Sequence, residues 1–242
     1  PVTDAEGADV PAKVRFDHVN FLYKGAKADS LTDISLTVKK GQTIGIIGGT
    51  GSGKSSLVNL IPRFYDATEG SVKVDGVDVR KMTQKDVRDR IGYVPQKGIL
   101  FSGTIDSNIR YGKTEISEDA VKKAAGVAQA TEFIDTKPER YKTPIAQGGS
   151  NVSGGQKQRL SIARAIAKDP EIFIFDDSFS ALDFKTDSTL RKALKEHTKE
   201  ATTIVAQRIS TILHADQILV LDEGEIVGKG THEAVSYTHL TL

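Results

Sequence analysis

Short apolar runs separated by polar turns fill the first part of the chain. Residues 13–23, KVRFDHVNFLY, alternate between apolar and polar positions and predict a half-buried strand. Residues 30–42, SLTDISLTVKKGQ, predict two further strands separated by polar turns. The apolar run TIGIIGG, residues 43–49, leads into a glycine-rich loop, and SSLVNLI after it predicts a helix that ends at Pro62.

The middle of the chain, roughly residues 83–168, is richer in helical patterns. One of them, SEDAVKKAAGVAQATEFI, begins at Ser117, which is a suitable N-cap. Strand patterns return in EIFIF at 171–175, TTIVAQ at 202–207 and QILVLDEGEIVGKG at 217–230. Residues 172–175 are apolar on both faces, as in a central parallel strand. The pattern therefore predicts a parallel-sheet α/β core interrupted by a helical insertion.

Composition excludes several classes of protein. The 242 residues carry 33 basic and 32 acidic side chains, a net charge of +1, and no basic stripe that would indicate a nucleic-acid partner. Cysteine is absent, so no disulfide or thiolate metal site can form. No apolar run approaches the about 18 residues that span a bilayer. Since the chain starts at Pro1, we expect a soluble fragment of a longer protein, with residues 1–12 as the end of a linker.

The glycine-rich loop GGTGSGKSS, residues 48–56, has the spacing of a phosphate-binding loop. Glycines let successive backbone N–H groups point at one anion, the lysine supplies charge for the β- and γ-phosphates, and the next hydroxyl can ligate Mg²⁺. Its position between an apolar strand and a helix supports this interpretation. The predicted nucleotide-binding residues here are Gly48, Thr50, Gly51, Ser52, Gly53, Lys54, Ser55 and Ser56.

Two further stretches carry candidate chemistry. Asp176 follows the buried strand IFIF and is placed to hold Mg²⁺ through water. Asp177 then either faces the attacking water or caps the next turn. Residues 153–156, Ser-Gly-Gly-Gln, stand at the start of a helix that ends before Pro170 and form a second anion site. Because one nucleotide needs only one phosphate loop, the second site is expected to serve a nucleotide held by another chain.

These motifs, in this order and together with SALD at 180–183, resemble the nucleotide-binding domain of an ATP-binding cassette (ABC) transporter over residues 13 to about 235. The resemblance implies ATP and Mg²⁺ as ligands and a head-to-tail dimer that encloses two ATP molecules. In that dimer, Ser153, Gly154, Gly155 and Gln156 contact the partner's ATP, with Val152 where leucine is usual. Ser180 to Asp183 match the loop that communicates across the dimer.

The resemblance also assigns single residues. Tyr23 matches the aromatic residue that stacks on adenine, although it also suits sheet packing. Gln96 matches the glutamine that touches Mg²⁺ and the attacking water and senses the membrane domain. The segment 100–112, LFSGTIDSNIRYG, and the segment 143–155 resemble exporters, with Gln147 in place of their usual glutamate. The implied partners are a second nucleotide-binding domain and the coupling helices of a membrane domain, at the cytoplasmic face of the membrane.

Two positions depart from the family. Asp177 stands where the general base is glutamate, so its carboxylate lies back by about 1.5 Å, one bond length. Gln207 stands where a histidine contacts the γ-phosphate, and an amide cannot carry its positive charge. Each substitution alone is compatible with an otherwise normal, active homodimer. Both together resemble the degenerate-site subunit of a heterodimeric bacterial multidrug exporter, which binds ATP but hydrolyses it slowly.

The predicted fold is therefore a P-loop NTPase (RecA-like) parallel-sheet core with an antiparallel β subdomain and an inserted α-helical subdomain. The core and β parts are expected at about 13–82 and 169–235 and the helical subdomain at about 83–168. Residues 236–242 lack a helical apolar pattern and are expected to be a non-native tail. The alternatives are a fully active homodimeric exporter ATPase, a soluble non-transport ABC ATPase, and a P-loop kinase, which would not explain the residue 153–156 motif.

Overall fold

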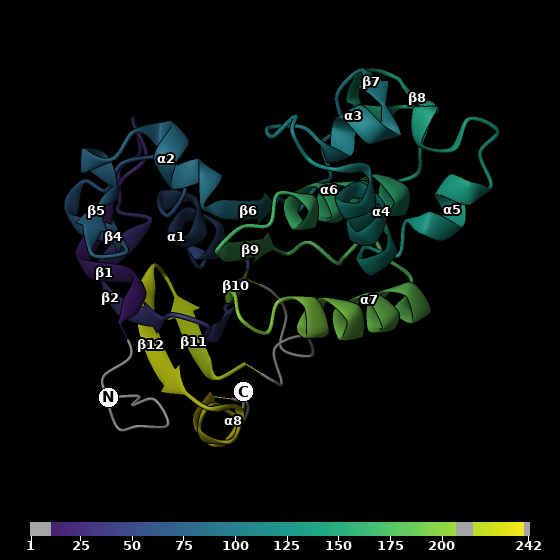
Figure 1. The fold of residues 1–242 in the computed structure, drawn as a ribbon. Coiled ribbons are helices and arrows are strands. Elements are labelled where there is room, and N and C mark those ends of the chain that lie inside the picture. The colour runs from purple at the N-terminus through teal and green to yellow at the C-terminus, as the bar shows by residue number, and fades with distance from the viewer. Residues whose placement is uncertain (1–10, 207–214, 240–242) are drawn as a thin grey trace. The chain divides into compact units, whose positions relative to one another are not determined.

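The computed structural model of the protein describes residues 11–206 and 215–239. The chain forms two compact units (Figure 1). Unit 1 consists of the residues up to Ile91 and from Glu200 onward, and unit 2 consists of Gly92–Lys199. Each unit contains buried apolar residues of its own.

Unit 1 contains two groups of strands and the helices that follow them. Its elements are β1 (Ala12–Phe21), β2 (Leu31–Lys39), β3 (Thr43–Ile47), α1 (Lys54–Leu60), β4 (Glu69–Val74), β5 (Val77–Asp78), the 3₁₀ turn Val79–Lys81, α2 (Gln84–Asp89), β10 (Thr202–Ala206), β11 (Gln217–Asp222), β12 (Glu225–Gly230) and α8 (His232–His239). Helix α1 ends at Leu60, before Pro62, as the sequence predicted.

An antiparallel sheet in the order β2-β1-β4-β5 confirms the predicted antiparallel part of the fold (Figure 1). The prediction of two strands in residues 30–42 is wrong, because Leu31–Lys39 is one strand. Asp33 has φ 48°, and its Oδ1 lies 2.7 Å from the Nδ1 of His18, which has φ 45°. Each is one extra residue in its own strand, so the two bulges compensate and the apolar side chains on both sides of them stay buried.

The other strands of unit 1 form the predicted parallel core. Their order is β12-β11-β3-β10, and β3 pairs in parallel with both β10 and β11. β12 returns antiparallel to β11 through the turn at Glu223 and Gly224. Helix α8 packs against this hairpin and buries Val235 beside Ile47 and Ile218. The helix extends to His239, beyond Val235 where the helical sequence pattern ends.

Unit 2 is mainly helical. Its elements are β6 (Ile91–Val94, beginning at the last residue of unit 1), β7 (Gly103–Thr104), α3 (Ile105–Ile109), α4 (Glu118–Val127), α5 (Thr131–Asp135), the 3₁₀ turn Arg140–Lys142, β8 (Pro144–Ile145), the 3₁₀ turn Gln147–Gly149, α6 (Gly154–Ala167), β9 (Ile172–Asp176) and α7 (Phe184–His197). Strand β9 lies beside β6 and is buried at all five positions, which confirms the prediction of a strand apolar on both faces.

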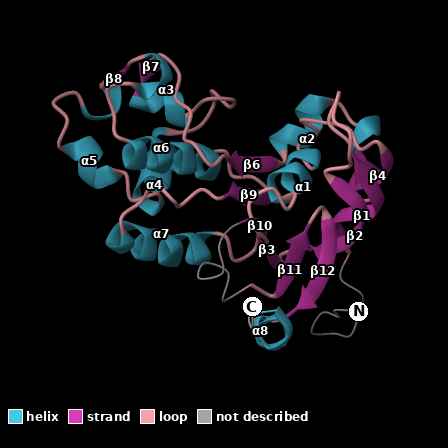
Figure 2. Ribbon diagram, turned by 180° about the vertical axis from the view of Figure 1, so that it is seen from behind, coloured by secondary structure: helices cyan, strands magenta, loops and turns pink. Residues whose placement is uncertain are grey.

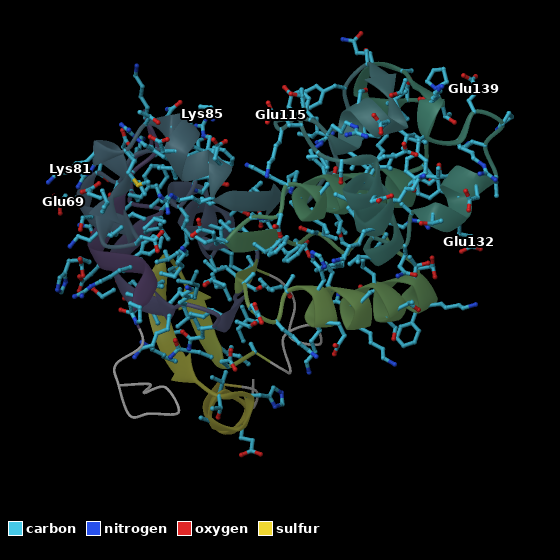
Figure 3. All side chains as sticks on the ribbon, viewed as in Figure 1. Glu69, Lys81, Lys85, Glu115, Glu132 and Glu139 are labelled. Atoms are coloured by element: carbon cyan, nitrogen blue, oxygen red, sulfur yellow. The ribbon has the colours of Figure 1, made fainter. Side chains whose placement is uncertain are left out.

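Helix α6 organises unit 2, because α3 and α4 both pack against it, and α4 also packs against α7 (Figure 2). The predicted N-cap at Ser117 is confirmed, since its side chain accepts a hydrogen bond from the Ala120 N–H. The helical pattern that follows is divided in two at Gln129, whose φ of 57° ends α4 before α5 begins. Charged side chains such as Glu132 and Glu139 lie on the outside of this unit (Figure 3).

Within residues 11–206 and 215–239, the longest helices are the 14-residue α6 and α7, and none has the length and apolar character needed to cross a bilayer.

Candidate functional site

The phosphate loop runs from β3 to α1 in unit 1 and folds closely on itself. A Cβ atom at Gly48 would lie 2.3 Å from the Ser52 Oγ and 2.5 Å from the Leu221 carbonyl oxygen, so no side chain fits there. Gly51 and Gly53 have φ of 81° and 103°, a region that disfavours L-residues. The backbone of the loop therefore requires glycine at positions 48, 51 and 53, which agrees with the sequence motif.

The Lys54 ammonium group contacts the backbone of this loop. Its Nζ donates to the carbonyl oxygens of Gly48 at 2.6 Å and Gly49 at 2.9 Å. Helix α1 begins at Lys54 with the αL residue Gly53 as N-cap and no side-chain capping hydrogen bond. A flexible glycine backbone, a cation and an uncapped helix start fit the phosphate groups of a nucleotide.

Tyr23 lies against the helix that follows the loop. Its hydroxyl is 2.9 Å from the Oγ of Ser56, in α1. Its ring makes edge contacts with Phe21 and Tyr65, at centroid distances of 4.6 Å and 5.2 Å. Tyr23 thus belongs to a cluster of aromatic side chains and hydrogen-bonds to helix α1. Its stacking on adenine stays a prediction.

The two adjacent acids of unit 2 differ in their surroundings. Asp176, the last residue of β9, is 8% exposed and accepts a hydrogen bond from the Tyr93 hydroxyl at 3.2 Å. Asp177 has φ 44°, a conformation that aspartate tolerates better than most residues. Its Oδ2 accepts a hydrogen bond from the Gln96 Nε2 at 3.1 Å. The structure therefore brings together the two residues that the sequence assigned to the attacking water.

The glutamine loop, residues 95–98, is also attached to helix α6. The Gln158 side chain, 1% exposed, donates from Nε2 to the Pro95 carbonyl oxygen at 3.1 Å. Gly98 lies directly on the α6 backbone, because a Cβ there would be 2.7 Å from the Lys157 carbonyl carbon. Sequence reasoning missed Gln158, since a glutamine inside a helix has no distinctive pattern.

The residues of the 153–156 motif form the start of α6, as predicted. The Ser153 side chain accepts from the Gln156 N–H at 3.2 Å, and the Gln156 Oε1 accepts from the Ser153 N–H at 3.1 Å. This reciprocal capping box satisfies two helix-end donors. Gly154 has open space around it, whereas a Cβ at Gly155 would be 3.3 Å from the Ala181 carbonyl oxygen. The motif is therefore locally well ordered, and its contact with a partner's ATP stays a prediction.

The SALD segment connects Asp177 to helix α7. The Ser180 Oγ donates to the Asp177 carbonyl oxygen at 3.3 Å. Asp183 is the N-cap of α7 and accepts from the N–H of Thr186 at 2.9 Å. The hydrogen bond from the Thr186 hydroxyl, followed by backbone hydrogen bonds, lowers the pKa of Asp183. The carboxylate therefore stays ionised in its capping role.

Arg164, another residue that sequence reasoning missed, fixes the segment after the glutamine loop. Its guanidinium donates to the carbonyl oxygens of Asn108 at 2.8 Å and Ile99 at 2.9 Å, and to Asn108 Oδ1 at 3.0 Å. It also lies over the stacked rings of Phe101 and Tyr111. Burial lowers its pKa to about 10, so it remains charged at neutral pH.

The predicted site residues are thus distributed over the two units. The phosphate loop and Tyr23 belong to unit 1, and Gln96, Asp176, Asp177 and residues 153–156 belong to unit 2. Gln207 lies outside the described residues. Hydroxyl, amide and carboxylate oxygens from Ser55, Gln96 and Asp176 are the hard ligands that suit Mg²⁺.

The comparisons with known proteins agree with this geometry. Residues 31–180 match the family model described as ABC transporter. An uncharacterized ABC transporter ATP-binding protein of Mycobacterium tuberculosis is 48% identical over 93% of the chain and 39% of its own length. A Staphylococcus aureus protein provisionally named a multidrug export ATP-binding/permease protein is 44% identical over 94% of the chain and 40% of its own length.

The structure of a bacterial Atm1-family ABC exporter with ATP bound matches with a TM-score of 0.89 and 38% identity, over 95% of this chain and 40% of that one. The chain therefore spans about two fifths of the length of these relatives. The fold prediction of a P-loop NTPase with parallel and antiparallel strands is confirmed. The chain belongs to the ABC transporter family, as a nucleotide-binding domain of the exporter type.

Proposed function

We propose that this chain is the ATP-binding domain of a heterodimeric ABC exporter and that its own nucleotide site hydrolyses ATP slowly. Lys54 and the loop glycines would bind the phosphates, and Ser55, Gln96 and Asp176 would hold Mg²⁺. Bound Mg²⁺ neutralises phosphate charge. The domain acts at the cytoplasmic face of the membrane, paired head-to-tail with a second nucleotide-binding domain and coupled to the helices of a membrane domain.

Slow hydrolysis follows from the residue at the base position. In ATP hydrolysis a water oxygen bonds to the γ-phosphorus, ADP leaves, and a base accepts the water proton. Asp177 is one methylene shorter than glutamate, so its carboxylate lies back by about 1.5 Å. A retreat of this size can lower the rate about 10²-fold.

The observation that carries the proposal is the hydrogen bond between the Gln96 amide and the Asp177 carboxylate, 3.1 Å long. The amide occupies Oδ2 of the carboxylate that would have to accept the proton of water. Gln207, at the position of the γ-phosphate histidine, adds no positive charge to stabilise the developing phosphoryl charge. Neither feature alters the phosphate loop, so we expect the site to bind ATP but to hydrolyse it slowly.

The residue 153–156 motif is proposed to serve the partner's ATP. Ser153→Ala in the full-length transporter should lower the partner site's hydrolysis and leave ATP binding to this chain's phosphate loop unchanged. Because the substitution also removes a helix cap, Ser117→Ala is the matched control, since it removes the corresponding cap of α4. Equal losses of hydrolysis in both variants would contradict the role in trans.

The rate of ATP hydrolysis by the purified full-length protein distinguishes this proposal from a fully active homodimer. If the protein hydrolyses ATP rapidly without a second subunit, the homodimer holds and the degenerate site is wrong. The proposal expects negligible turnover alone, abolished ATP binding in Lys54→Ala, and turnover only with the co-expressed partner. A soluble non-transport ABC ATPase is not favoured, because the Staphylococcus aureus relative and the Atm1-family structure are both named as export proteins.

A further inference from the structure

The hydroxyl of Tyr93 contacts a carboxylate of the candidate magnesium site. Tyr93 is the third residue of β6, and β6 lies beside β9, whose last residue is Asp176. The Tyr93 Oη donates to the Asp176 Oδ2 at 3.2 Å. Both residues belong to unit 2, so one compact unit determines this geometry.

Two further hydrogen bonds join the same two short segments. The Ser178 Oγ donates to the Val94 carbonyl oxygen at 2.7 Å, and the Gln96 Nε2 donates to the Asp177 Oδ2 at 3.1 Å. Ser178 is fully buried, so its hydrogen bond is shielded from water. Residues 93–96 therefore hold three consecutive residues of the acidic segment, and the two neighbouring hydrogen bonds help to fix the position of Tyr93 relative to Asp176.

A carboxylate at a metal site needs a defined orientation. Asp176 is largely buried, and a donor on Oδ2 restrains the rotation of its side chain. Residues that hydrogen-bond a metal-holding carboxylate orient it, and their loss commonly weakens metal affinity by about 10–100-fold. Phenylalanine would keep the ring of Tyr93 and remove the hydroxyl that makes this hydrogen bond.

We propose that Tyr93 is a positioning residue for magnesium, which acts by holding Oδ2 of Asp176. The inference rests on the proposed function, since it takes Asp176 as the residue that holds Mg²⁺. It assigns Tyr93 no contact with ATP or with the attacking water. Its signature is therefore a change in metal dependence without a change in metal-free nucleotide binding.

The test uses the full-length protein and its Tyr93→Phe variant. ATP binding is measured by calorimetry in EDTA and then during a Mg²⁺ titration at fixed ATP. We expect metal-free ATP affinity within about twofold of wild type and a half-saturating Mg²⁺ concentration about 10-fold higher, the lower end of the usual range. Tyr111→Phe, which removes an exposed hydroxyl from the same unit, should leave both quantities unchanged.

Asp176→Asn gives a second arm. If Tyr93 acts through Asp176, adding Tyr93→Phe to Asp176→Asn should change the Mg²⁺ titration no further. An unchanged titration in Tyr93→Phe alone, an equal loss of metal-free ATP binding, or additive effects in the double variant would each overturn the proposal. Absence of ATP binding in wild type would instead contradict the proposed function, so the two failures are distinguishable.

Discussion

Replacing Gly98 with alanine should destabilise the protein strongly, although the change adds only one methyl group. The new Cβ would lie 2.7 Å and 2.8 Å from the Lys157 carbonyl carbon and oxygen and 2.9 Å from the Gln158 nitrogen. Ordinary contacts begin at 3.4 Å, so the nearest pair must separate by 3.4 − 2.7 = 0.7 Å. All three atoms are helix backbone and cannot rotate away, so the glutamine loop must move off α6.

Two contributions set the magnitude. Overpacking of this kind costs about 1–3 kcal/mol. Moving the loop also stretches the 3.1 Å hydrogen bond between the buried Gln158 amide and the Pro95 carbonyl, and an unsatisfied buried group costs about 1–3 kcal/mol. We therefore expect a loss of about 2 kcal/mol or more in the free energy of unfolding, and a fall in Tm of about 4 °C or more.

Thermal unfolding followed by circular dichroism measures this effect, and Gly126→Ala is the matched control. Gly126 is an exposed residue of helix α4, where an added Cβ would meet nothing closer than 3.9 Å. There alanine should stabilise the helix by up to about 1 kcal/mol. The two glycine-to-alanine changes thus have opposite predicted signs. A Gly98→Ala protein as stable as wild type would refute the close packing of the glutamine loop on α6.

Two further predictions concern unit 2. Arg164→Lys should lower stability by about 2–3 kcal/mol, because a single ammonium cannot replace a planar group bonded to Ile99 and Asn108; denaturation that gives wild-type stability would contradict this. Burial, then the charge of Lys123, lowers the pKa of His197, while Asp169 raises it. The unfolded chain therefore binds more protons than the folded one below about pH 6.5, and stability should fall as the pH drops from 7.5 to 5.5. His197→Gln should show a smaller fall in Tm over this range, and an equal fall in both proteins would show that His197 contributes nothing.

Local patterns predicted much of the fold correctly. Buried strands, the phosphate loop and the Ser117 cap depend on residues that are neighbours in sequence, so spacing and residue type identify them. The merged strand Leu31–Lys39 was missed because a polar Asp33 reads equally as a turn or a bulge. The bulge is accompanied by cross-strand contacts of Asp33 with Asn20 and His18, which are 13 and 15 residues away, so a local pattern does not reveal it.

The site was predicted as motifs but not as a network. Gln96 and Asp177 are 81 residues apart and Tyr93 and Asp176 are 83 apart, and no local pattern pairs them. Gln158 and Arg164 were missed for the same reason, because their partners lie far along the chain, on the glutamine loop and the segment after it. Their roles are seen only in the tertiary structure, which brings these distant carbonyl groups to the surface of α6.

We propose that the site formed on this chain's phosphate loop binds ATP and hydrolyses it slowly because of Asp177 and Gln207. The most direct measurement is single-turnover hydrolysis by the full-length transporter with the partner's site inactivated. It compares wild type with the Asp177→Glu and Gln207→His double variant at equal ATP occupancy. We expect single-turnover ATP hydrolysis to be about 100-fold faster in the double variant. Rapid hydrolysis by wild type, or the same rate in both proteins, would contradict it.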